Sequence, residues 1–294
     1  MTKRKQYART FGQDLMRGEH VVGGGMSKAF NAQQWVNDKI DDGDIAGGMA
    51  SRQSGTSIFD PVICELAYTW FTAKGAAILD PFAGGSVRGI VAAYLGRHYT
   101  GIDLRAEQIE ANGIQAEAIV PDSIPQWIAG DSLEMSELLP DDEFYDFVFS
   151  CPPYADLEVY SDDPRDISTM DYEDFLHVYR EIIQLSIARL RDDRFACFVV
   201  GDVRDRRGNY RDFVGDTVQA FRDAGCEYYN DAVLVTAVGS LPIRAGRQFQ
   251  AGRKFGKTHQ NVLVFVKGDG KRATTYCGPV VVDMSLLDSD NGGK

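Results

Sequence analysis

The sequence predicts an α/β fold with a mostly parallel sheet that is covered by helices on both faces. From residue 59 onward, short apolar segments alternate with longer segments of helical periodicity, which is typical of repeated strand–helix–strand units. The apolar segments show little polar alternation, as expected of parallel strands buried on both faces. A final pair of apolar segments has no helical segment between its members and predicts a hairpin that adds one antiparallel strand.

The expected elements follow in order along the chain. Strands are expected at 76–79, 99–102, 127–129, 147–149 and 195–200. Helices are expected at 61–73, 85–95, 106–118, 172–190 and 210–224, the first with proline in its first turn. The hairpin strands are 228–238 and 261–267. The loop between them, 239–260, is longer than most connections, which hints at a function.

Composition indicates three regions. Residues 1–57 are rich in glycine and polar side chains and predict a segment that is flexible or ordered by a partner, with one short helix at 28–40. Residues 58–268 predict one catalytic domain, since 44% of the 294 residues are hydrophobic, enough for a sizeable core. Residues 269–294 predict a short extension and a polar tail.

Charge, hydropathy and cysteine usage narrow the class of protein. No apolar run approaches about 20 residues, and no apolar stretch follows the basic start, so we expect neither a membrane span nor a secretory signal. The five cysteines are odd in number and scattered, which predicts a cytoplasmic protein without disulfides or a metal site. The net charge of −12 argues weakly against a nucleic-acid coat protein but allows a local basic patch.

The first candidate site is the segment DPFAGGS, residues 80–86. Strand 76–79 leads into Asp80, then into a turn with Gly84 and Gly85, where a ligand could lie against the backbone. The pattern is not G-x-G-x-x-G, which disfavours a nicotinamide oxidoreductase. Asp103 ends the next strand, 23 residues after Asp80, where an acid typically binds ribose hydroxyls, and Asp131 follows the third strand.

Three acids that end three successive strands predict a nucleoside site with an attached amino acid, and S-adenosylmethionine fits it. Alternatively, each Asp merely caps its following helix.

The second candidate site is the segment SCPPY, residues 150–154. Two successive prolines offer no N–H, so the backbone presents only carbonyl acceptors, and an aromatic ring follows. Cys151 and the carbonyl of Pro152 could accept the two protons of an exocyclic amino group, while Tyr154 stacks on the planar ligand. Alternatively, Cys151, Pro152, Pro153 and Tyr154 form a plain turn that ends a strand.

The two segments together resemble motifs I and IV of the amino-group DNA methyltransferases, a branch of the class I S-adenosylmethionine-dependent enzymes. The resemblance covers roughly residues 59–267 and implies a Rossmann-like, seven-stranded sheet with one antiparallel strand. It implies a transfer of the methyl group to adenine N6 or cytosine N4. The residues that it places at the cofactor are Phe59, Asp60, Pro61, Asp80, Phe82, Gly84, Gly85, Asp103, Leu104, Asp131 and Ser132.

Two departures from the family bear on the substrate. The family usually has Asp, Asn or Ser directly before Pro-Pro, but this chain has Cys151, a weak acceptor, and Ser150 could supply the acceptor instead. A nucleophilic role for Cys151 is a further alternative. No large recognition block is present, so base choice would rest on 1–57, 155–171 and 239–260.

A concentrated basic stretch lies near the end of the predicted domain. Between residues 241 and 268 there are six Lys or Arg and no acid, with Phe249 and Phe255 interleaved. We expect it to neutralise backbone phosphates, although a solvated loop is the alternative. The residues expected to contact nucleic acid are Arg244, Arg247, Arg253, Lys254, Lys257 and His259.

The sequence therefore predicts a DNA methyltransferase that acts on a flipped base of double-stranded DNA, of the restriction-modification, orphan or phage kind. A homodimer is left open. Alternatives are methylation of an amino group in RNA or of a protein glutamine, and a cofactor-binding accessory protein without activity. Residues 156–163 could form a lid or an acidic loop, and Gly201 and Asp202 could line the target pocket or form a turn.

Overall fold

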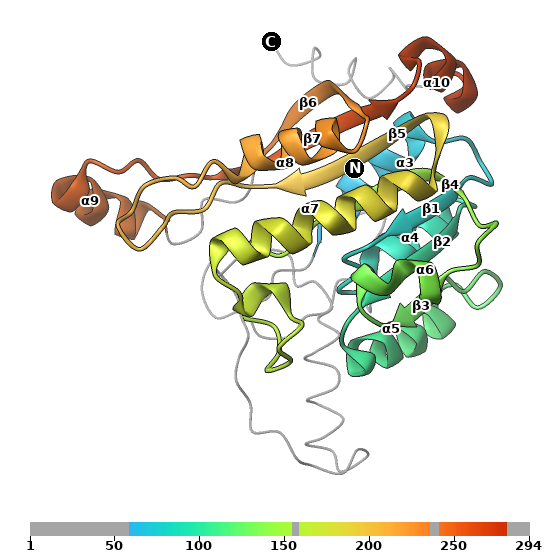
Figure 1. Ribbon diagram of the computed structural model, residues 1–294, viewed down its shortest axis with the longest axis horizontal. Coiled ribbons are helices and arrows are strands. Elements are labelled where there is room, and N and C mark those ends of the chain that lie inside the picture. Colours follow the sequence, from blue (N-terminus) through green and yellow to red (C-terminus); the bar gives the residue numbers. More distant parts are fainter. Residues whose placement is uncertain (1–58, 155–158, 236–240, 281–294) are drawn as a thin grey trace, which may run out of the picture.

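The computed structural model describes residues 59–154, 159–235 and 241–280 (Figure 1). Within these ranges lies one sheet of seven strands in the order β3-β2-β1-β4-β5-β7-β6. Its strands are β1 Ala77–Asp80, β2 His98–Asp103, β3 Gln126–Ala129, β4 Tyr145–Ser150, β5 Leu190–Val200, β6 Glu227–Val235 and β7 His259–Lys267. Strands β1 to β5 pair in parallel, and β7 runs antiparallel to both β5 and β6. The predicted sheet with one antiparallel strand is confirmed.

Helices cover both faces of the sheet, as predicted. They are α3 Pro61–Phe71, α4 Val87–Tyr94, α5 Ala106–Ile119, α6 Met135–Leu138, α7 Tyr172–Arg189, α8 Phe213–Asp223, α9 Leu241–Gly252 and α10 Gly270–Cys277, with short 3-10 turns η1 Ser132–Glu134 and η3 Ile167–Thr169. One apolar core contains side chains of α3, α4, α5 and α10, and the other contains side chains of α6, α7 and α8. Successive strand residues alternate between the two cores, as Ile78 and Leu79 do.

The order of the strands places a topological switch point between β1 and β4. From β1 the chain proceeds outward through β2 to β3, whereas β4 and β5 extend in the opposite direction. Strands β1 and β4 are direct neighbours, with Leu79 paired to Val148. In open parallel sheets, ligands bind beyond the carboxyl ends of the strands at such a point. The segments that begin at Asp80 and at Cys151 both leave the sheet there.

Local signals explain the first helix. The side chain of Asp60 accepts a hydrogen bond from the amide of Val62 at 3.0 Å, which caps α3, and Pro61 occupies the first helical position. The ring of Phe59 packs edge-on against Phe149 of β4, with ring centroids 5.7 Å apart. The start of α3 is thereby attached to the strand that precedes the Cys-Pro-Pro-Tyr segment.

Several elements differ from the prediction, and helix α6 was not expected. The segment 239–260, expected to be a loop, contains helix α9, which begins with proline in its first turn. Strand β5 begins at Leu190, five residues before the expected 195, because the polar residues 191–194 hid its start. Helix α10 lies in the expected tail, and its Ala273 is fully buried. The expected helix at 28–40 lies outside the described residues.

Candidate functional site

Asp80, at the end of β1, is fully buried, and the chain itself supplies all its hydrogen bonds. Its Oδ1 accepts from Ser150 Oγ at 2.5 Å and from the Phe82 amide at 3.2 Å. Its Oδ2 accepts from Arg88 Nε at 2.5 Å and from Tyr99 Oη at 2.8 Å. A carboxylate has about four acceptor positions, so none remains for a ligand. The direct cofactor contact expected of Asp80 stays a prediction, and its visible role is to hold the turn.

Arg88 of α4 fixes the turn from within the protein. Its Nη2 donates to the carbonyls of Phe82 at 2.6 Å and Ala83 at 2.9 Å, in addition to the ion pair with Asp80. The guanidinium also lies 4.8 Å from the ring centroid of Phe59. Because these groups are buried and their donors and acceptors meet one another, the turn has a fixed shape before any ligand arrives.

The glycines of the turn leave open space above the backbone. Gly84 has φ +49°, a conformation that favours glycine, and a Cβ built at Gly84 or Gly85 would meet nothing within 4 Å. Below the turn, Asp103 Oδ2 accepts from the Gly84 amide at 2.8 Å, and Asn112 Nδ2 donates to the Gly84 carbonyl at 2.7 Å. A ligand can therefore approach this backbone closely from the open side.

The ends of β2 and β3 meet the same turn. Asp103 accepts a second hydrogen bond from the Arg105 amide at 3.0 Å, and burial raises its pKa, although Arg105 and the two amides lower it. Asp131 accepts from the Leu133 amide at 2.9 Å, and Ser132 Oγ donates to the carbonyl of Pro81 at 2.7 Å. The structure thus brings the predicted acids of β2 and β3 to one edge, and Leu104 lies half-buried beside Asp103.

Phe82 and Ser150 point into the protein. The Phe82 ring packs against Tyr179 and Phe198 in the core that α7 covers. The Ser150 side chain is fully buried beneath Asp80. Ser150 therefore lies turned away from the open edge, which disfavours the alternative that it accepts a hydrogen bond from a substrate.

The Cys-Pro-Pro-Tyr segment forms a corner against the ends of β5 and β7. Tyr154 Oη accepts a hydrogen bond from the side-chain Nε2 of Gln260. It lies 3.5 Å from the Val199 carbonyl oxygen and 3.8 Å from Cys151 Sγ. Burial is the larger cause, and the neighbouring Cys151 the smaller one, of a raised pKa of Tyr154, so its hydroxyl stays protonated at neutral pH. A Cβ built at Gly201 would lie 4.0 Å from the Tyr154 ring. Pro152 is buried, whereas Cys151, Pro153 and Tyr154 are half-buried.

The predicted basic residues have different surroundings. Arg247, Arg253 and His259 are exposed, and the Arg253 guanidinium lies 5.1 Å from the ring centroid of Phe249. Lys257 is 3.8 Å from Asp202, and burial lowers its pKa although Asp202 raises it. Lys254 is half-buried, and Arg244 belongs to α9.

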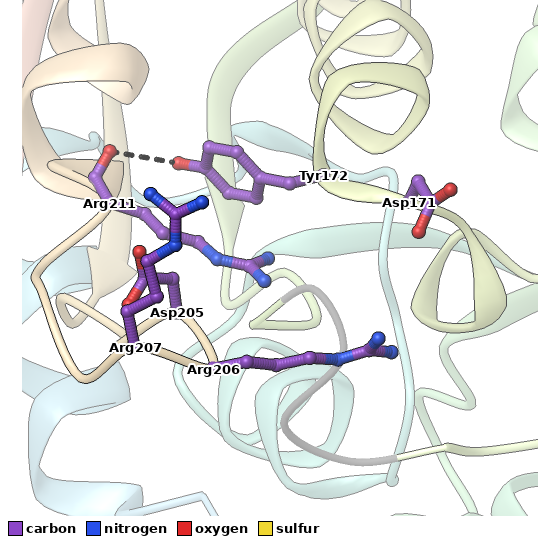
Figure 2. Close-up of a pocket in the computed structure, with 6 residues that line it drawn as sticks. All are labelled: Asp171, Tyr172, Asp205, Arg206, Arg207 and Arg211. Carbon is purple, nitrogen blue, oxygen red and sulfur yellow. Dashed lines mark hydrogen bonds between the residues drawn. The ribbon is translucent and has the colours of Figure 1, made fainter.

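The sequence reasoning missed a second basic segment, 204–211, which follows β5. Arg206, Arg207 and Arg211 line a hollow of about 260 Å³ together with Asp171, Tyr172 and Asp205 (Figure 2). Four arginines among eight residues were the available signal.

Two classes of feature are absent from the described ranges. Residues 59–154, 159–235 and 241–280 contain no group of three His, Cys, Asp or Glu side chains arranged to hold a metal ion. Within the same ranges, every helix is too short or too polar to cross a membrane.

Comparison with known proteins gives distant structural similarity only. Neither a protein-family profile nor a curated protein matches the sequence. TrmN from Thermus thermophilus is 17% identical with a TM-score of 0.47, over 71% of this chain and 49% of that protein, so this chain spans about half its length. A TehB-like SAM-dependent methyltransferase from Corynebacterium glutamicum is 16% identical with a TM-score of 0.43 (80% and 95% covered). Magnesium protoporphyrin IX methyltransferase from Synechocystis, solved with bound SAM, is 13% identical with a TM-score of 0.46 (83% and 100% covered).

Proposed function

We propose that this protein is an S-adenosylmethionine-dependent methyltransferase that modifies the exocyclic amino group of adenine (N6) or cytosine (N4) in double-stranded DNA. The observation that carries the proposal is the adjacency of two segments. The open glycine turn after β1 and the Cys-Pro-Pro-Tyr corner after β4 leave neighbouring strands at the switch point of the sheet. Strands pair about 4.8 Å apart, so a ligand on one segment is within reach of a ligand on the other.

The residues at this edge fit the cofactor. Asp103 accepts two backbone amides and so keeps about two further acceptor positions, which suit the two ribose hydroxyls. Asp131 accepts one amide and retains acceptor capacity for the adenine amino group. The open space above Gly84 and Gly85 admits the amino-acid part of the ligand against the backbone.

The remaining cofactor residues act around these contacts. In this proposal Asp80 is a positioning residue, because its carboxylate fixes the turn through Arg88 and Ser150. The other residues proposed to border the cofactor are Phe59, Asp60, Pro61, Phe82, Leu104 and Ser132. When bound, S-adenosylmethionine supplies a methyl group on a positively charged sulfur, which an amine nitrogen accepts with loss of one proton.

The corner after β4 is proposed to bind the target base. The Pro152 carbonyl and Cys151 Sγ each accept a hydrogen bond from the amino group, which draws the nitrogen lone pair out of conjugation with the ring. Acceptors at this point also stabilise the positive charge that grows on nitrogen. Tyr154, fixed by Gln260, presents its ring to the base, and Pro153 limits the backbone to one conformation.

The basic side chains near the hairpin are proposed to bind the phosphates of the duplex. A base must leave the stack to reach this corner, and contacts to the DNA backbone hold the opened duplex in place. The side chains assigned to this role are Arg244, Arg247, Arg253, Lys254, Lys257 and His259, although Lys257 also pairs with Asp202. An amino group of RNA or a protein glutamine would fit the same corner, and a non-catalytic accessory role is the further alternative.

One experiment separates these possibilities. The purified protein is incubated with methyl-labelled S-adenosylmethionine in three parallel reactions. They contain mixed-sequence DNA, structured RNA and a protein extract, respectively. DNA and RNA are digested to nucleosides and analysed by mass spectrometry. From the DNA reaction we expect the deoxynucleoside of N6-methyladenine or of N4-methylcytosine. Label in RNA or protein only would replace the DNA assignment, and cofactor binding by calorimetry without label transfer would favour the accessory role.

A further inference from the structure

The arginine-rich segment 204–211, which the proposed function leaves unused, forms an ordered hairpin beside the target corner. Arg204 and Tyr210 form an antiparallel bridge, and the Asp205 amide donates to the Asn209 carbonyl at 2.8 Å. Gly208, at φ +86°, closes the turn, and its amide donates to the Asp205 carbonyl at 2.8 Å. The backbone of the hairpin is therefore ordered by its own hydrogen bonds.

The arginines of the hairpin divide into two groups. Arg204 is used internally, because its Nη1 donates to the Gly208 carbonyl at 2.8 Å and its guanidinium lies 3.8 Å from the Tyr210 ring centroid. Arg206 and Arg207 are exposed and line the hollow together with Arg211 (Figure 2). Three guanidinium groups thus border one hollow in a chain whose net charge is −12.

Helix α7 forms the opposite wall of the hollow. Tyr172 Oη donates to Asp216 Oδ2 at 2.8 Å and lies 3.4 Å from the Arg211 carbonyl oxygen. The Arg211 guanidinium lies 4.6 Å from the Tyr172 ring centroid. These contacts hold Arg211 in place. Asp171 and Asp205 also line the hollow, but Asp205 Oδ1 already accepts the Asn209 amide at 2.8 Å.

The hollow lies next to the target corner in both sequence and space. The hairpin begins three residues after Gly201, where a Cβ would lie 4.0 Å from the Tyr154 ring, and it ends two residues before Phe213, whose ring centroid is 6.2 Å from that of Tyr154. The hairpin also meets the second basic segment, since Lys257 Nζ lies 5.8 Å from the Tyr210 ring centroid and Lys254 packs against Gly208. The two basic segments therefore contact each other.

We propose, on the basis of the function proposed above, that the hollow bordered by Arg206, Arg207 and Arg211 binds a phosphodiester of the nucleic-acid strand next to the target nucleotide. Three of the six residues that line the hollow are arginines, which suits an anionic group. Guanidinium groups bind phosphate oxygens in pairs and keep their charge at any physiological pH. The site positions the strand and carries no base specificity.

The test compares binding of a fluorescein-labelled mixed-sequence DNA duplex, by anisotropy, between about 50 and 200 mM salt. The double variant Arg206→Gln/Arg207→Gln is expected to bind at least about tenfold more weakly, and its salt slope should fall by about 1 unit, because one phosphate contact is lost. Arg222→Gln/Lys271→Gln is the matched control. It removes the same charge at the opposite end of β6 and β7, where Glu227 pairs with Val266, and should bind like the wild type.

A second variant tests the local sign of the charge. Asp171 makes no side-chain cap contact with α7, so Asp171→Asn removes a carboxylate from the hollow without removing a helix cap and should tighten binding several-fold. Unchanged affinity and slope in the arginine double variant would overturn the phosphate site while leaving the proposed function intact. Salt-dependent binding that the double variant loses, without methyl transfer to any nucleic acid, would support the site and contradict the proposed reaction. A wild-type protein that binds no nucleic acid would overturn both.

Discussion

Ser150 Oγ donates a hydrogen bond to Asp80 Oδ1 at 2.5 Å, and both side chains are fully buried. The two residues are 70 positions apart in the sequence and end the neighbouring strands β4 and β1. The bond therefore couples the two segments on which the proposed function depends, the glycine turn and the Cys-Pro-Pro-Tyr corner. A change at one of them is expected to reach the other.

Ser150→Ala removes one of the four donors to Asp80. Because a buried carboxylate is left short of a partner, we expect a loss of about 1–3 kcal/mol in the free energy of unfolding, measured by urea denaturation. Ser186→Ala is the matched control, since Ser186 is equally buried but donates only to the Ile182 carbonyl within α7. Equal losses in both variants would show that the Asp80 contact has no special weight.

Asp103→Ala removes the carboxylate proposed to bind the ribose. We expect the dissociation constant for S-adenosylmethionine to rise about 10–100-fold by calorimetry, the scale of lost charge-assisted hydrogen bonds. Exposed Asp122→Ala should leave it unchanged. Burial raises the pKa of Asp103, so the ionised acceptor is lost at a higher pH than for an ordinary aspartate. Wild-type affinity should thus weaken as pH falls through that raised value, a step that Asp103→Asn should lack.

Tyr154 offers a comparison of ring and hydroxyl. Tyr154→Ala should lower methyl transfer by at least about tenfold, since it removes a base-stacking surface worth about 1–3 kcal/mol, and should spare cofactor affinity. Tyr154→Phe keeps the ring but loses the hydrogen bond from Gln260, so its activity should lie between that of the wild type and that of Tyr154→Ala. Single-turnover rates and cofactor calorimetry give both quantities. Equal activity of all three proteins would remove the target base from this corner.

Cys151 separates two chemical roles. If its sulfur accepts an amino proton, Cys151→Ser should keep or raise activity, because a hydroxyl is the better acceptor, and Cys151→Ala should lower it. If the sulfur is a nucleophile, both substitutions should abolish activity. Initial rates with saturating cofactor distinguish the patterns, and loss of activity in the serine variant would contradict the acceptor role.

Asp146 of β4 contacts residues of both β1 and β5. We expect it to make the free energy of unfolding depend on pH. Burial alone would raise its pKa, but the Ala77 amide at 3.0 Å, Arg194 at 3.0 Å and Arg191 at 3.1 Å together lower it. A lowered pKa stabilises the fold above the unfolded value of about 3.9, and that stabilisation is lost as pH falls through the folded value. Asp146→Asn should be less stable at neutral pH and show a flatter decline in acid. Parallel acid-unfolding curves would contradict this.

The sequence predicted the sheet well because its signals are local. Strands 76–79 and 99–102 agree with β1 and β2 to within one residue, since buried parallel strands read as short apolar runs between turns. The placement of Asp103 and Asp131 at strand ends followed from the same pattern. Helix α9 was missed because Gly246 and Gly252 weaken its helical signal.

The partners of Asp80 could not be predicted from the sequence. Arg88, Tyr99 and Ser150 meet its carboxylate only through the packing of α4, β2 and β4 around β1. An acid at the end of a strand has the same sequence signal whether it faces a ligand or lies beneath a turn. The arginine hairpin was visible as composition, but its hollow depends on Tyr172, more than thirty residues earlier.

Helix α9 lies at the far end of the molecule from α10, between two strands that stay paired up to Val235 and His259 (Figure 1). Because the insertion between these strands leaves their hydrogen-bond ladder intact, the ladder does not depend on the length or sequence of the insertion. A different insert at this place should therefore leave the paired strands of the sheet in their register.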